Sequence, residues 1–120
     1  MKPALLILLL AFCTSAFAQK KELIQDKKAI QERADAELDA AMAPGGPLYT
    51  VIQENGLKGK MDAQISFREK GDVSSVFVVA FDGSIEDQNR FRSALHAFRF
   101  HFKMPKGQQY RIEKHFDLNP

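Results

Sequence analysis

The sequence predicts a two-layer α+β fold, in which a helix packs on one face of a three-stranded antiparallel sheet and an amphipathic helix precedes the domain. Three observations lead to this prediction. Apolar and polar residues alternate along residues 60–68 and 109–118, which is the period of half-buried strands, and residues 73–81 are dense in β-branched and aromatic side chains. Two segments are rich in helix formers, one before the strands and one between the second and the third. One sheet with a helix across it would bury every apolar stripe.

The beginning of the chain, residues 1–18, is expected to be a signal peptide that is cleaved during export. A positive charge is followed by the apolar run of residues 4–12, and Ala16-Phe17-Ala18 has the small residues that a signal peptidase accepts. The apolar run is shorter than the roughly 20 residues that cross a bilayer. Cleavage between Ala18 and Gln19 would place the protein in the periplasm or outside the cell, with no membrane span left.

Two alternatives compete with this interpretation of the leader. Without cleavage it would be a membrane anchor. A lipoprotein would be attached through Cys13, but the bulky Phe12 stands where a small residue is expected. Because Cys13 is the sole cysteine, the mature chain would have no disulfide and would depend on a packed core. The formal net charge of +2 predicts no strong attraction to nucleic acid.

Residues 19–43 are expected to form the N-terminal amphipathic helix. The segment has no Gly or Pro and is rich in good helix formers. Its apolar residues recur at helical spacing in one narrow stripe: Leu23, Ile30, Ala34, Leu38 and Ala41. A narrow stripe buries little area, so the helix either packs lightly on the domain, which we favour, or waits for a partner. Residues 44–47, Pro-Gly-Gly-Pro, are expected to be a linker.

The domain proper is expected to cover residues 48–118 and to begin with a short helical turn that Gly56 closes in a left-handed cap. Residues 60–68 then alternate between apolar and polar, and residues 73–81 follow, dense in β-branched and aromatic side chains. Gly71 lies in the tight turn between them and is the expected positive-φ residue. The two strands should therefore form a hairpin.

A second helix is expected from residue 85 to residue 97. Ser84 precedes it as the N-cap, with Asp87 three residues on in a pattern similar to a capping box. After this helix, three phenylalanines alternate with polar residues: Phe98, Phe100 and Phe102. Such an alternation is more often part of a core than of a ligand groove.

The last strand is expected at residues 109–118. Its apolar side chains point to one side of the sheet: Tyr110, Ile112, Phe116 and Leu118. Its polar side chains point to the other: Arg111, Glu113, His115 and Asp117. Lys114 interrupts the apolar side, and a lysine in this position often marks the exposed edge of a sheet.

No residue pattern indicates catalysis, a metal site or a cofactor, and we expect the protein not to be an enzyme. The three histidines lack the spacing of metal ligands: His96, His101 and His115. The serines have no nucleophile-elbow context. Capping and the helix dipole explain the acidic residues near turns and near the second helix.

Several short motifs follow one another in a fixed order between residues 48 and 118. They comprise two glycines around an aliphatic residue, a turn glycine before a Val-rich strand, an aromatic-x-Phe stretch before proline and glycine, and an alternating last strand. The residues are Gly56, Leu57 and Gly59, then Gly71 and Val73, then Phe98-Arg99-Phe100, then Pro105 and Gly107, then residues 110–118. In this order and spacing the region resembles the C-terminal domain of TonB-type energy transducers.

The resemblance implies a module that binds by strand addition, because in that family the last strand is an edge that pairs with a short extended segment of an outer-membrane transporter. Carried over to this sequence, the partner-binding edge strand has seven residues: Tyr110, Arg111, Ile112, Glu113, Lys114, His115 and Phe116. Three features depart from the family: a cleavage site ends the leader, the long Pro-rich spacer is missing, and Thr50 stands in the place of a proline. The resemblance therefore implies a free-standing TonB-like domain that serves as a periplasmic binding or adaptor module for a protein or an extended peptide.

Two further hypotheses remain open beside this one. The same edge, or the N-terminal helix, could join two copies into a homodimer, which would make the chain a self-associating structural protein of the envelope. A small secreted enzyme or inhibitor is the other hypothesis, and it would need a pocket with converging polar groups.

Overall fold

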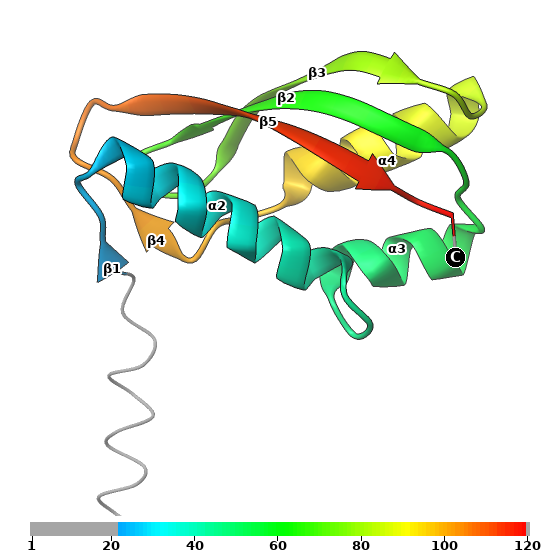
Figure 1. The fold of residues 1–120 in the computed structure, drawn as a ribbon, viewed down its shortest axis with the longest axis horizontal. Helices are drawn as coiled ribbons and strands as arrows, with labels where there is room; N and C mark the ends of the chain where they lie inside the picture. Colours follow the sequence, from blue (N-terminus) through cyan, green and yellow to red (C-terminus); the bar gives the residue numbers. More distant parts are fainter. Residues whose placement is uncertain (1–21, 120) are drawn as a thin grey trace, which may run out of the picture.

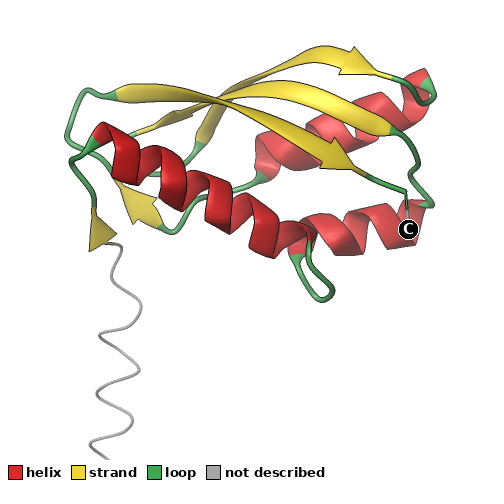
Figure 2. Cartoon of the chain, in the orientation of Figure 1, coloured by secondary structure: helices red, strands yellow, loops and turns green. Residues whose placement is uncertain are grey.

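The computed structural model describes residues 22–119, so the expected signal peptide and its cleavage between Ala18 and Gln19 lie outside the described residues. The described chain is an α+β domain in which helices cover one face of a three-stranded antiparallel sheet (Figure 1). The other face of the sheet carries no helix (Figure 2). The predicted fold class, with its three antiparallel strands and its helices, is confirmed at this level.

The sheet consists of β2 (Lys60–Arg68), β3 (Val73–Phe81) and β5 (Gln109–Asp117) in the order β3-β2-β5. β2 and β3 form the predicted hairpin, and Gly71 in its turn has a φ of 92°. A Cβ on Gly71 would collide with the backbone carbonyl of Phe100, so the turn needs glycine both for its φ and for this close approach. The central strand, β2, is thus paired on both sides.

Three helices lie on the covered face: α2 (Lys27–Met42), α3 (Pro47–Asn55) and α4 (Ile85–Ala97). α4 packs along β3, whereas α2 runs beneath β5 (Figure 1). Ser84 caps α4 as predicted, since its Oγ accepts a hydrogen bond from the backbone N–H of Asp87 at 3.1 Å.

The short helix α3 ends as predicted but begins earlier than expected. Gly56 closes it with a φ of 60°. Pro47 is its first residue, whereas the sequence predicts that residues 44–47 form a linker. Proline suits the first helical position because its missing N–H would have no partner there and its fixed φ is already helical.

Helix α2 begins later than expected, because Asp26 caps it by accepting a hydrogen bond from the N–H of Ala29 at 3.0 Å. The residues before it form β1 (Glu22–Leu23), which runs parallel to β4 (Phe102–Lys103). The prediction of helix at residues 22–26 was therefore wrong. Leu23 is half-exposed and does not belong to the apolar stripe of the helix.

The rest of that stripe is fully buried and belongs to the main core. Its members are Ile30, Ala34, Leu38 and Ala41, and none is more than 3% exposed. The core also contains phenylalanine pairs in ring contact, among them Phe67 with Phe100 at 4.7 Å and Phe91 with Phe116 at 5.1 Å between ring centroids. Helix α2 is thus an integral part of the packed domain. Within the described part of the chain, none of the helices has both the length and the apolar character needed to cross a bilayer.

Candidate functional site

The last strand lies at one edge of the sheet. β5 pairs with β2 in an unbroken register from Gln109 opposite Arg68 to Asp117 opposite Lys60. Among residues 22–119, no strand pairs with the other side of β5. One side of its backbone is therefore available for hydrogen bonds to another chain.

The register also tells which residues present these free backbone groups. The N–H of Leu118 donates to the carbonyl of Gly59 at 2.9 Å, so the backbone of Leu118 faces β2. In an antiparallel strand, consecutive residues direct their N–H and C=O to opposite sides. Counting back in steps of two, Ile112 and Lys114 also face β2. The middle of the free edge is then formed by the backbones of Arg111, Glu113 and His115, with Gln109 and Asp117 at its ends.

The opposite edge of the sheet, β3, is blunted in two ways. Its pairing with β2 is shifted at two places, between Asp62 and Ala63 and between Ser66 and Phe67. Such bulges twist an edge and interrupt its row of hydrogen-bonding groups. In addition, Arg92 on α4 donates from Nε to the carbonyl of Val76 at 3.2 Å. The two edges therefore differ, because β5 has neither a register shift nor such a cap.

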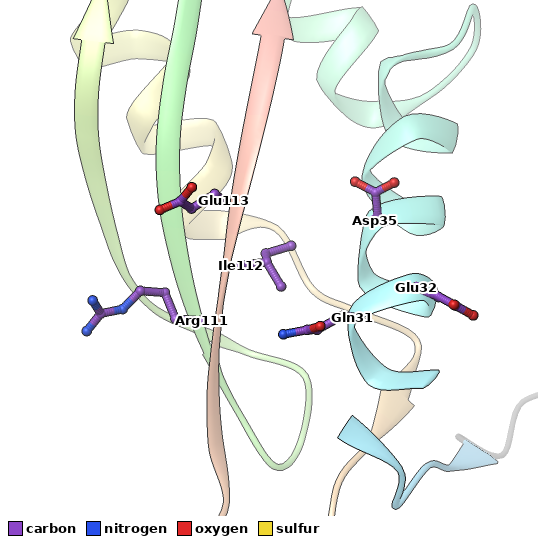
Figure 3. Close-up of a pocket in the computed structure, with 6 residues that line it drawn as sticks. All are labelled: Gln31, Glu32, Asp35, Arg111, Ile112 and Glu113. Carbon is purple, nitrogen blue, oxygen red and sulfur yellow. The ribbon is translucent and has the colours of Figure 1, made fainter. Parts of the chain in front are cut away.

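A groove of about 480 Å³ lies between β5 and helix α2. Six residues line it, three from each element: Gln31, Glu32, Asp35, Arg111, Ile112 and Glu113. Figure 3 shows Ile112 directed from β5 toward α2, while Arg111 and Glu113 leave the strand on its other side. A chain that paired with the free edge of β5 would lie along this groove.

Lys114 connects the two walls of the groove. Its Nζ lies 2.6 Å from Oδ1 of Asp35 and 2.6 Å from Oδ1 of Asp39, both on α2. Its side chain is only 14% exposed. Burial by itself would lower the pKa of Lys114, but the hydrogen bonds to Asp35 and Asp39, together with their charges, outweigh it and raise the pKa above its ordinary value.

The face of the sheet that carries no helix is polar along β5. Nδ1 of His115 lies 2.6 Å from Oδ1 of Asp62, and Nε2 of Gln64 donates to Oε1 of Glu113 at 3.2 Å. Apolar side chains appear on this face only toward β3, where Phe77 and Val79 are more than half-exposed. The side chains around the free edge can thus select a partner by charge and hydrogen bonding.

The seven residues expected to bind a partner differ in how exposed their side chains are. Ile112 and Phe116 are buried, so their side chains cannot reach a partner. Tyr110 is packed against the core. The exposed side chains are those that also border the free edge: Arg111, Glu113 and His115.

Sequence reasoning missed the α2 wall of the groove. Gln31, Asp35 and Asp39 are four residues apart and so lie on one flank of the helix, beside the apolar stripe. This spacing could have been noticed in the sequence. The sequence does not show, however, that this flank of α2 lies beside the last strand.

Between residues 22 and 119, no three His, Cys, Asp or Glu side chains are grouped so that they could hold a metal ion. No side-chain N or O atom buried within the described residues lacks a hydrogen-bond partner. No protein-family model matches the chain, and no curated protein or solved structure is significantly similar to it.

Proposed function

We propose that this protein is an exported, non-enzymatic binding module that recognises an extended segment of a partner protein by adding it as a fourth strand beside β5. The observation that carries this proposal is the difference between the two edges of the sheet. β3 is bulged and capped by Arg92, whereas β5 runs in unbroken register and borders a groove. An edge that is left open while its counterpart is blunted is suited to strand addition.

The expected strength of such binding is modest. Arg111, Glu113 and His115 each offer one N–H and one C=O, so the middle of the edge can form six backbone hydrogen bonds. At about 0.5–1.5 kcal/mol net each, the six bonds contribute roughly 3–9 kcal/mol before the cost of ordering the partner. This corresponds to a dissociation constant in the millimolar to micromolar range at best. Side-chain contacts along the groove must therefore supply selectivity and further affinity.

The resemblance to the C-terminal domain of TonB-type transducers supports the same mode of binding. In this proposal β5 takes the place of that family's partner-binding strand. With an N-terminal segment typical of a signal peptide, the proposed place of action is the periplasm or the exterior. A segment of an outer-membrane transporter is the class of partner that the resemblance suggests.

The proposal is tested by removing one free-edge donor without disturbing the fold. Glu113→Pro deletes an N–H that faces away from β2, and proline is tolerated on that side of an edge strand. Glu113→Ala is the matched control, because it removes the same side chain and keeps the N–H. Binders would be selected from a displayed library of extended peptides on the wild-type protein. We expect Glu113→Pro, but not Glu113→Ala, to weaken them about tenfold.

Amide hydrogen exchange provides an independent measurement. A bound peptide should protect the amides of Arg111, Glu113 and His115, which face the free edge, more than it protects any amide of β3. Peptides that bind equally well to Glu113→Pro, or that protect β3 instead, would refute strand addition at β5.

Self-association is the second candidate, and one relationship on β5 favours it. If two copies of β5 paired antiparallel about Ile112, Arg111 of each copy would lie opposite Glu113 of the other. Opposite charges in such cross-strand pairs are stabilising. Sedimentation at rising concentration tests this candidate, since a dimer that Glu113→Arg abolishes would support it.

A further inference from the structure

We propose that the strand that adds to β5 belongs to a different protein and carries a lysine or arginine opposite Ile112, directed at the carboxylates of helix α2. This inference rests on the proposed function and specifies the partner that the groove would select. It concerns the inner wall of the groove, which is formed by α2, and the charge of the residues along it.

The groove is acidic. Two of the α2 residues that line it, Glu32 and Asp35, are carboxylates, whereas the charged groups of Arg111 and Glu113 lie on the other side of β5 (Figure 3). The adjacent pair of Asp39 and Lys114 adds no net charge. Glu32 is exposed and forms no hydrogen bond or ion pair with any residue of the described part of the chain. Glu32 therefore keeps an unpaired carboxylate on α2, and its side chain leaves the helix on the side away from β5 (Figure 3).

Alternation along a strand decides which side chain of the partner meets this wall. The partner residues opposite Arg111 and Glu113 would form the hydrogen bonds and point to the helix-free face of the sheet. The residue opposite Ile112 would point inward, as Ile112 does, toward α2 (Figure 3). A long basic side chain could lay its methylene groups beside Ile112 and place its charge near Glu32 and Asp35.

Lys114 illustrates this arrangement within the molecule itself. It projects from the inner side of β5 and holds two α2 carboxylates at 2.6 Å each. A basic residue opposite Ile112 on an added strand would lie one strand further out and two residues along from Lys114, over the same helix. An acidic residue there would be repelled by the wall, and an apolar one would cover Asp35 and Glu32 without compensating their lost hydration.

The same wall disfavours a second copy of this chain as the occupant. In the antiparallel pairing about Ile112, the residue opposite Ile112 is another Ile112, which has no charge to offer. The pairing would also bring the acidic flanks of two α2 helices to the same side of the sheet. Like charges brought together reduce affinity and so act against the wrong partner.

The test uses three synthetic nine-residue peptides that alternate threonine and valine and differ only in the central residue: lysine, norleucine or glutamate. Binding to the full chain is measured by isothermal titration calorimetry at low salt and again at about 0.5 M salt, which screens exposed charges. We expect the lysine peptide to bind about tenfold more tightly than the norleucine peptide, and the glutamate peptide most weakly. The preference should shrink at high salt.

Two variants locate the effect on the protein. Glu32→Lys should remove the preference for lysine and favour the glutamate peptide. Glu86→Lys, at an exposed position of α4 far along the chain from the groove, is the matched control and should leave the order of the peptides unchanged.

The outcomes separate this inference from the proposed function. Equal binding of the three peptides, with the amides of Arg111 and Glu113 protected, would overturn the basic preference and leave strand addition standing. Failure of all three to bind, together with failure of the displayed library, would overturn both. A dimer that excludes the peptides would show that the occupant is a second copy and would also overturn the inference.

Discussion

Arg92 on α4 donates a hydrogen bond from its Nε to the carbonyl oxygen of Val76 at 3.2 Å, at the edge of the sheet that lies farthest from β5. A side chain from the helix layer thus occupies a backbone group that an incoming strand would need. If this contact protects β3, then Arg92→Met should lower the free energy of unfolding by about 1 kcal/mol and increase aggregation on heating. Urea denaturation and light scattering measure the two effects. Unchanged scattering would indicate that the bulges alone protect this edge.

The ion pairs of Lys114 predict a dependence on alkaline pH. Since the pKa of Lys114 is raised in the folded protein, the stability that its charge provides is complete below the pKa of an unfolded lysine, about 10.4, and is lost as the pH rises through the folded value. Lys114→Met should cost about 1 kcal/mol at neutral pH, because Asp35 and Asp39 are more than half-exposed and stay hydrated. In urea titrations the two proteins should differ at neutral pH, and the difference should close as the pH rises above about 10.4 and through the folded pKa of Lys114. A difference that persists at high pH would indicate lost packing instead.

Helix α2 should stabilise the domain substantially. Leu38 is fully buried, so Leu38→Ala should cost about 2–5 kcal/mol in the free energy of unfolding. Leu23→Ala is the control, because Leu23 is half-exposed in β1 and should cost less than about 1 kcal/mol. Chemical denaturation of both variants measures how much the buried stripe of α2 contributes to the free energy of unfolding. Similar, small losses would favour light attachment.

Gly71 is expected to be the least replaceable residue of the hairpin turn. Gly71→Ala should cost more than about 2 kcal/mol, because its φ of 92° disfavours a side chain and its Cβ would meet the carbonyl of Phe100. Gly107→Ala is the matched control, since Gly107 has a φ of 81° but open space around it. That variant should lose only about 1 kcal/mol. Thermal unfolding of the pair separates backbone strain from steric collision.

Much of the sheet could be predicted from the sequence, because β2 and β5 are long enough for their alternation to be recognised and β3 is dense in β-branched and aromatic residues. The bounds of β2 and β3 and the glycine in their turn agree with the prediction. The cap at Ser84 was likewise predictable, since it depends only on neighbouring residues. Local chemistry and simple periodicity were sufficient in these places.

Two other features, the β1–β4 pair and the late start of α2, could not be predicted from the sequence, and the reason is physical. The paired strands β1 and β4 have two residues each, which is too few to show any period. They are far apart in the sequence and meet only in the tertiary structure. The late start of α2 follows from the same pairing, because Glu22 and Leu23 gain backbone partners outside the helix.

The candidate site was foreseen only as a strand. Which of its residues face outward depends on a single register, here established by Leu118 and Gly59, and the sequence does not state it. The acidic flank of α2 could be seen as a spacing of four residues, but its position beside β5 depends on how the helix packs. The groove is therefore a property of the tertiary structure.

The alternation of β5 divides its residues into one group that faces the interior and another that faces the solvent. Tyr110, Ile112, Lys114 and Phe116 build the interior and the ladder to β2, while Arg111, Glu113 and His115 meet the solvent with both backbone and side chain. Substitutions in the second group should therefore alter the proposed recognition at little expense to folding. Descendants of this domain could diversify in what they recognise while inheriting one unaltered scaffold.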